Sequence, residues 1–142
     1  MKITLNKKQN SDVHFEAENA NGHKVEMFNS SAPNPQAASP MELILMGLSG
    51  CSSIDIVHIL KKQNLNIDDL QMEVEGFRKD TDPKVFHTIQ LLVKLKGEIP
   101  PNKAFRAAKL SFEKYCSVSK MLDQTVDIQY KVELNGEKIQ SS

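Results

Sequence analysis

Apolar positions are concentrated between Ser39 and Gln63, and this stretch of the chain predicts one long helix. It opens with the residues of a helix start, because Ser39 suits the N-cap and Pro40 suits the first helical position. Glu42 stands three residues after the cap, where its side chain completes a capping box. No further proline interrupts the stretch, so we expect the helix to run through it.

Apolar side chains surround this helix instead of following one face. A helix that is apolar all round is buried in a protein core or in a membrane. Glu42, Asp55 and His58 lie inside the stretch and argue against a membrane span. The pattern therefore predicts a buried central helix and no membrane partner. The apolar positions are Leu43, Ile44, Leu45, Met46, Leu48, Ile54, Ile56, Val57, Ile59 and Leu60.

Alternating apolar and polar positions on both sides of this helix predict strands. Asn21-Gly22 is a strong signal for a hairpin turn inside the first group of strands. Asn135-Gly136 ends the last strand, and the tail to Ser142 is expected to be loose or to form a short edge pairing. We expect strands at 2–8, 13–17, 23–28, 70–77, 85–96 and 125–134, a turn-rich loop at 29–39, and helices at 103–115 and 117–122.

Strands, one long helix, more strands and a helix pair are typical of an α+β fold with helices packed on sheet. The length of 142 residues predicts a single domain over 1–142. A helix that is apolar on all sides needs cover on all sides, which a chain of this length does not supply. We therefore expect a symmetric homodimer in which the long helices are packed between antiparallel sheets.

Composition excludes some classes of function. The 18 basic and 18 acidic residues cancel, there is no tryptophan, and no basic stripe is present, so no nucleic-acid partner is expected. The first ten residues contain no apolar segment of the kind found in signal peptides, which predicts a cytoplasmic protein. In that compartment the two cysteines are expected to be free, catalytic or redox-active rather than a structural disulfide.

Both cysteines are candidate reactive residues. Cys51 lies among small and hydroxylic residues, SGCSS, and is either a buried thiol acting as a small apolar side chain or a redox thiol. Cys116 lies between two expected helices, where a helix N-terminus favours the thiolate, and Lys114 and Lys120 flank it. There is no CxxC motif and no histidine pair at metal-binding spacing, so no metal and no cofactor are predicted.

Three other polar residues of the long helix are weaker candidates. Glu42 is either an acid–base group or simply the third position of the capping box. Asp55 lies one turn after Cys51 and is expected to pair with a lysine or arginine from another strand or another subunit. His58 is expected to be a satisfied histidine of the core or of an interface rather than a base.

The stretches SPMELILMGLSGCSSIDI and EKYCSVSKML together resemble the OsmC/Ohr family, and the fit is closest to its YhfA-like, generically OsmC-like, branch. The likeness extends over nearly the whole chain. It implies an intertwined α+β homodimer with two active sites at the subunit interface. It also implies thiol peroxidase chemistry acting on a small apolar hydroperoxide, as part of an oxidative stress response.

The resemblance also implies roles for the cysteines. Cys51 would attack the peroxide bond as a thiolate and become a sulfenic acid, and Cys116 would resolve it as a disulfide. A dithiol reductant, such as a lipoylated protein or a thioredoxin-type protein, would then reset the pair.

The sequence differs from the peroxidases of this family in two places. In those enzymes a glutamate directly follows the proline of the helix start, and an arginine from the N-terminal strands holds the thiolate and that glutamate. Here Met41 follows Pro40, Glu42 comes one residue later, and residues 1–77 contain no arginine. These differences favour an alternative function, a non-catalytic module that binds a small apolar ligand or senses redox state.

Overall fold

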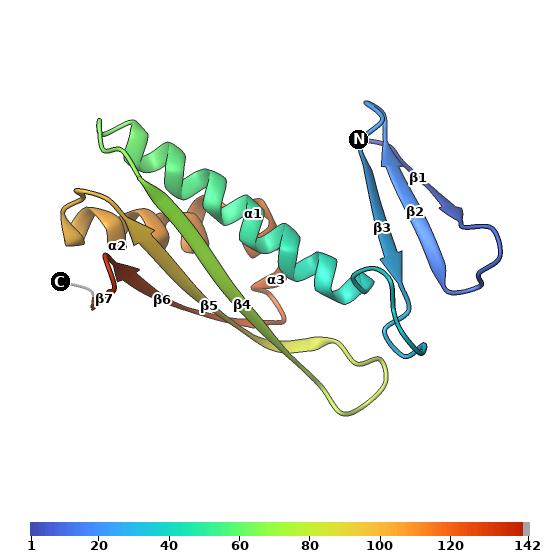
Figure 1. The fold of residues 1–142 in the computed structure, drawn as a ribbon. Coiled ribbons are helices and arrows are strands. Elements are labelled where there is room, and N and C mark those ends of the chain that lie inside the picture. Colours follow the sequence, from blue (N-terminus) through green and yellow to red (C-terminus); the bar gives the residue numbers. More distant parts are fainter. Residues whose placement is uncertain (141–142) are drawn as a thin grey trace. The chain divides into compact units, whose positions relative to one another are not determined.

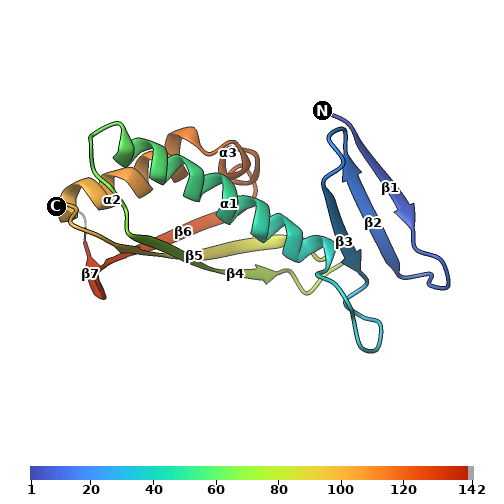
Figure 2. The same cartoon turned by 45° about the horizontal axis from the view of Figure 1, so that its top comes forward.

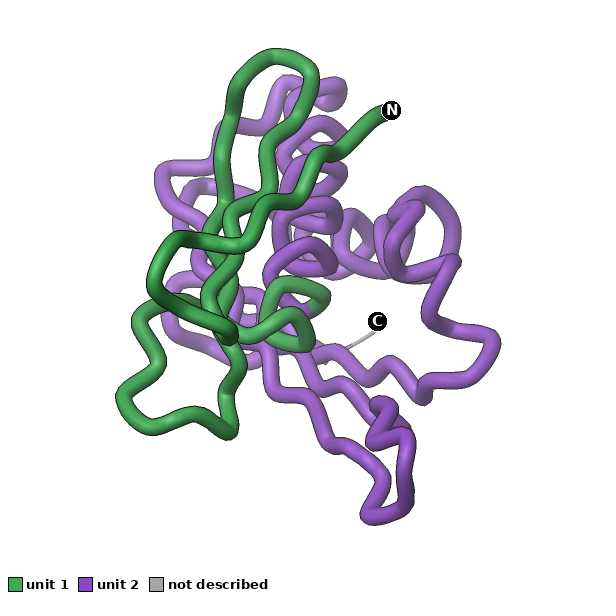
Figure 3. The backbone as a smooth tube through the Cα atoms, turned by 90° about the vertical axis from the view of Figure 1, so that its right-hand side faces the viewer, with its two compact units in different colours: residues 1–44 green, residues 45–142 purple. Residues whose placement is uncertain are grey.

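The computed structural model describes residues 1–140, and the chain forms two compact units. The first unit is Met1–Ile44 and the second begins at Leu45, as coloured in Figure 3. The end of the tail, Ser141 and Ser142, lies outside the described residues. The α+β class predicted from the sequence is confirmed.

The first unit is an antiparallel meander of the three predicted strands in the order β1-β2-β3. The Asn21-Gly22 turn is confirmed, because Gly22 has a φ of 84° and the Asn19 N–H donates to the His23 carbonyl at 3.0 Å. The strands are β1 (Ile3–Lys7), β2 (His14–Asn19) and β3 (Lys24–Phe28).

The meander has one charged face and one apolar face. On the charged face Lys8 pairs with Glu26 at 2.9 Å. On the other face Leu5, Ala17 and Val25 are direct cross-strand neighbours. Leu5 is 52% exposed and Val25 is 48% exposed, so this apolar row is largely uncovered in a single chain.

The long helix α1 (Pro40–Lys61) begins with the predicted capping box. The Glu42 N–H donates to Ser39 Oγ at 3.2 Å, and the Ser39 N–H donates to Glu42 Oε2 at 2.7 Å. These hydrogen bonds, first of all the one from the Ser39 backbone, lower the pKa of Glu42 from its ordinary value. The reciprocal bonds satisfy two of the N–H groups that a helix start leaves unpaired.

The second unit is a four-stranded sheet with helices on one face (Figures 1 and 2). The strand order is β4-β5-β6-β7, and β7 is the short edge pairing that the tail was expected to form. The strands are β4 (Asp69–Arg78), β5 (Phe86–Lys96), β6 (Asp127–Leu134) and β7 (Glu137–Ile139). The helices between β5 and β6 are α2 (Pro101–Leu110), the π-helical turn η1 (Ser111–Tyr115) and α3 (Ser117–Leu122).

The prediction of antiparallel sheets is wrong for this unit, because β5 and β6 run parallel. The reason is the helical connection: α2, η1 and α3 return the chain to the starting end of β5 before β6 begins. The second helix also starts two residues earlier than expected, at Pro101, because proline fits the first turn of a helix.

The core of the second unit lies between α1 and the helix-facing side of the sheet. Leu48 and Ile56 of α1 are fully buried, as are Ile89 and Val93 of β5. The opposite face of the sheet is polar, with an ion pair between Lys94 and Glu73.

Burial of α1 follows one stripe, so a single chain does not cover the helix on all sides, as the length of the chain led us to expect. The buried positions recur every fourth residue: Leu48, Ser52, Ile56 and Leu60. Met46 is 53% exposed, Ile54 is 63% exposed and Val57 is 41% exposed. One sheet covers only one side of a helix, which leaves the outer side of α1 apolar and uncovered.

By length and composition, α1 alone among the helices of residues 1–140 is able to cross a membrane, with a mean hydropathy of 1.8. Core helices of globular proteins reach the same value. Since Leu48, Ile56 and Leu60 are fully buried in the fold, we interpret α1 as a core helix.

Gly76 of β4 lies where α1 and β5 leave no room for a side chain. A Cβ added there would overlap the ring of Phe86 and lie 3.1 Å from Cδ2 of Leu45. We expect Gly76→Ala to lower the free energy of unfolding by about 1–3 kcal/mol, measured by urea denaturation. The Phe86→Leu substitution removes the overlapping ring atoms. Gly76→Ala should therefore lower the free energy of unfolding less in a Phe86→Leu background than in the parent. Equal costs in both backgrounds would contradict this account.

Candidate active site

The π-helical turn η1 determines where Cys116 lies. The Cys116 N–H donates to the carbonyl of Ser111 at 2.8 Å, a hydrogen bond that spans five residues instead of four. Cys116 is then the N-cap of α3, and its sulfur accepts the Ser119 N–H at 3.4 Å. The turn therefore ends one helix and starts the next around the thiol.

The two cysteines meet in the structure although 65 positions separate them in the sequence. The reactive atoms of Cys51, Asp55 and Cys116 all lie within 4.8 Å of one another. Cys51 is half-buried, Cys116 is completely buried, and both are free thiols. The site thus contains one thiol that solvent reaches and one that it does not.

Asp55 is held by a neutral hydroxyl group. Ser111 Oγ lies 3.3 Å from Asp55 Oδ2 and 3.2 Å from the carbonyl oxygen of Ser52. Ser111 is fully buried in η1, so this contact fastens η1 to α1. We expected a lysine or arginine from another strand or another subunit as the partner of Asp55, and within residues 1–140 of one chain no such ion pair forms.

Burial raises the pKa of the Cys116 thiol to about 12, and the nearby Cys51 and Asp55 act in the same direction. The Ser119 N–H opposes this shift but does not outweigh it. The N–H group at the helix start therefore favours the Cys116 thiolate, as expected, but burial outweighs it. The cause is desolvation, which disfavours the charged form of a buried group.

The lysines that flank Cys116 in sequence are engaged elsewhere. Lys114 lies over the ring of Tyr115, 5.2 Å from its centroid. Lys120 pairs with Asp123 at 2.5 Å.

Of the three residues proposed from the sequence, the structure brings Cys51 and Cys116 together. Glu42 belongs to the first unit, where both of its hydrogen bonds go to Ser39, so its capping role is confirmed. His58 is exposed in a single chain, so it is not a core histidine, and its place at an interface stays a prediction. Sequence reasoning missed Ser111, because only the π-helical turn places its hydroxyl against α1.

Two thiols and one carboxylate are also possible ligands of a soft metal ion. They supply three donors, whereas a closed structural zinc site has four. The group is thus better suited to thiol chemistry than to holding a structural metal.

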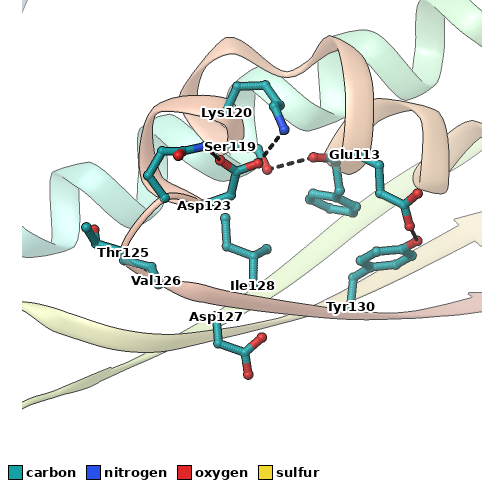
Figure 4. A pocket seen from close by; sticks show the side chains of 11 residues that line it. Glu113, Ser119, Lys120, Asp123, Thr125, Val126, Asp127, Ile128 and Tyr130 are labelled. Carbon is teal, nitrogen blue, oxygen red and sulfur yellow. Dashed lines mark hydrogen bonds and ion pairs between the residues drawn. The ribbon is translucent and has the colours of Figure 1, made fainter.

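A separate cleft of about 560 Å³ lies between the η1–α3 segment and β6 (Figure 4). Neither cysteine lines it. Tyr130 donates to Glu113 Oε1 at 2.8 Å at one end, and Lys120 pairs with Asp123 at the other. This polar lining does not suit an apolar substrate. The cleft is lined by Phe112, Glu113, Ser119, Lys120, Asp123, Gln124, Thr125, Val126, Asp127, Ile128 and Tyr130.

The raised pKa of Cys116 predicts unequal thiol reactivity. At pH 8, iodoacetamide should modify Cys51 in the folded protein. The rate of Cys116 modification should be at least about 100-fold lower in folded than in urea-unfolded protein, as measured by peptide mass spectrometry. Between pH 8 and 10 the Cys116 rate should rise about tenfold per pH unit, because the thiolate fraction does so below the pKa. Modification of folded Cys116 at the unfolded rate would contradict the assignment.

Comparison with known proteins shows the family to which the chain belongs. The family described as OsmC-like protein matches residues 32–131. Protein YhfA of Escherichia coli (strain K12) is 37% identical over 121 residues, which cover 84% of this chain and 89% of YhfA.

Solved structures share the fold. The crystal structure of a hypothetical protein from Aquifex aeolicus VF5 has a TM-score of 0.84 and 27% identity, covering 94% of this chain and 95% of that one. An organic hydroperoxide resistance protein OsmC from Legionella pneumophila has a TM-score of 0.71 and 20% identity, covering 93% of this chain and 95% of its own. The family match and the identity to YhfA confirm the resemblance seen in the sequence: the chain belongs to the OsmC-like family.

Proposed function

We propose that this protein reduces organic hydroperoxides with Cys51 as the peroxidatic thiol and Cys116 as the resolving thiol. The observation that supports this most is the meeting of the two thiols within 4.8 Å, one half-buried and one fully buried. The OsmC-like family and the fold shared with an organic hydroperoxide resistance protein support the same chemistry.

The first step takes place at Cys51. Its thiolate sulfur attacks the outer oxygen of the hydroperoxide, the O–O bond breaks, and the alkoxide leaves and takes up a proton to become an alcohol. The sulfur is oxidised by two electrons to a sulfenic acid, and the peroxide is reduced by the same two electrons.

The second step closes the Cys51–Cys116 disulfide and releases water. A protonated, buried Cys116 suits this role, since it does not compete with Cys51 for the peroxide. A dithiol reductant, lipoylated or of the thioredoxin type, then reduces the disulfide by thiol–disulfide exchange. Two free cysteines of this kind fit a reducing compartment, so we place the protein in the cytoplasm.

Residues at the start of α1 favour a second candidate function. Met41 stands where the family peroxidases have a glutamate, and Glu42 is occupied by the capping box. No arginine occurs in residues 1–77 to stabilise a thiolate there. Without that glutamate and arginine, the protein would not turn over hydroperoxide continuously. It would instead sense redox state or bind a small apolar ligand.

We further propose that the protein acts as a homodimer. The outer side of α1 and the apolar row of the meander are both exposed in one chain. A Cβ added at Gly47 or Gly50 would meet nothing within 4 Å, which leaves room for a second chain to approach α1 closely. A second copy would remove this apolar surface from water.

Replacement of the peroxidatic thiol tests the proposed function. After one equivalent of tert-butyl hydroperoxide, the parent should lose two thiols per chain, counted with a chromogenic disulfide under denaturing conditions. Cys51→Ser should lose none on the same timescale, and Cys116→Ser should accumulate a sulfenic acid that dimedone traps. Equal peroxide consumption by Cys51→Ser would exclude Cys51 as the nucleophile. If the thiols are oxidised once but peroxide consumption does not continue when a dithiol is added, the result would favour the redox-sensing function.

A charge on the outer side of α1 tests the dimer. Ile54→Lys places an ammonium on a position that is 63% exposed in one chain, so it should leave the fold intact but separate the subunits. Light scattering coupled to gel filtration should give twice the chain mass for the parent and the single mass for Ile54→Lys. Gln71→Lys, on the polar face of β4, should stay dimeric. A parent of single mass would overturn the dimer.

A further inference from the structure

The chemistry proposed above leaves one half-buried acidic group, Asp55, without a function. Asp55 lies one helical turn after Cys51, and its carboxylate lies within 4.8 Å of both sulfurs. The Ser111 hydroxyl shares its one proton between that carboxylate, at 3.3 Å, and the Ser52 carbonyl, at 3.2 Å. A carboxylate fixed beside a reacting pair of thiols is positioned to accept a proton from either of them.

We propose that Asp55 is the general base of the resolving step, taking the proton from Cys116 as its sulfur attacks Cys51. This inference deepens the proposed function and rests on it. It assigns a catalytic residue to the site in place of the glutamate that the start of α1 lacks.

The step balances as follows. The Cys116 sulfur forms a bond to the sulfur of the Cys51 sulfenic acid, and the S–O bond of that acid breaks. The proton of the Cys116 thiol passes to Asp55 and from there to the departing hydroxide, which leaves as water. Both sulfurs end in the disulfide, and Asp55 returns to its carboxylate form.

The environment of Cys116 makes such a base necessary. Burial raises its pKa to about 12, so the thiol is protonated at neutral pH. The titratable groups that act on its sulfur are Cys51 and Asp55, both from α1, while Lys114 and Lys120 are engaged with Tyr115 and Asp123. Within residues 1–140 no cation acts on this sulfur to create the thiolate in advance, so the proton has to leave during the attack.

The distances permit the transfer. A general base acts through direct hydrogen bonding or through one water molecule. The Asp55 carboxylate and the Cys116 sulfur lie within 4.8 Å of each other, so a short movement during the attack brings them to direct hydrogen-bond distance.

The test follows disulfide closure in Asp55→Asn. This variant keeps an oxygen for the Ser111 hydroxyl but removes the base. The rate of sulfenic acid formation is measured separately by rapid dimedone trapping, and disulfide closure from the sulfenic acid should slow by about 10²- to 10⁴-fold. Asp55→Glu should recover part of the rate. Matching thermal unfolding midpoints for the parent and Asp55→Asn would show that the fold is retained.

Whether disulfide closure becomes slower or faster in Asp55→Asn distinguishes a general base from a negative charge that only raises the Cys116 pKa. If Asp55 acted only as a negative charge, its removal would lower the Cys116 pKa and speed closure. If it is the base, closure in Asp55→Asn should be slow at pH 7 and rise about tenfold per pH unit up to pH 9, because hydroxide then ionises the thiol. Parental or faster closure in Asp55→Asn would overturn the proposal.

A second assay does not depend on peroxide. Ellman's reagent, 5,5′-dithiobis(2-nitrobenzoate), first forms a mixed disulfide at Cys51 and releases one coloured thiolate. Attack by Cys116 then releases the second, and the same base would accept the proton. Slow release of the second coloured thiolate in Asp55→Asn, together with no reaction of the parent with peroxide, would contradict the proposed function but support the role of Asp55 as a base. If the second coloured thiolate is released at the parental rate, the role of Asp55 is contradicted and the proposed function is unaffected.

Discussion

The hydroxyl of Ser111 joins two segments that the chain brings together from far apart. Its contacts to the Ser52 carbonyl and to Asp55 fasten η1 to α1. The π-helical hydrogen bond from Cys116 to Ser111 then fixes the second thiol relative to the same residue. Because one fully buried serine makes both connections, the spacing of the two sulfurs depends on a local backbone geometry and not on long flexible side chains.

Much of the fold follows from patterns in the sequence. The capping box at Ser39 and Glu42 fixes the start of α1, and Asn21-Gly22 fixes the first hairpin. Strict alternation from Ile89 to Leu95 indicates β5. These features are predictable because each depends on residues that are neighbours in the chain.

The parts that sequence could not give depend on contacts between distant segments. The parallel pairing of β5 and β6 follows from where the helical connection returns the chain. The π-helical turn reads as ordinary helix in the sequence, so Ser111 could not be placed. The Cys116 thiol was expected to be acidic from its position at a helix start, whereas burial, a property of the folded protein, decides its protonation.

Oxidation would also change how firmly the second unit is held together. A bond between Cys51 and Cys116 would close a loop of about 65 residues, and such cross-links stabilise folded chains by roughly 4 kcal/mol in the chain-entropy model. That loop contains β4, β5, α2 and η1. The disulfide-bonded form would then resist heat and proteases better than the reduced form. The redox state of the two thiols would therefore also affect the lifetime of the protein.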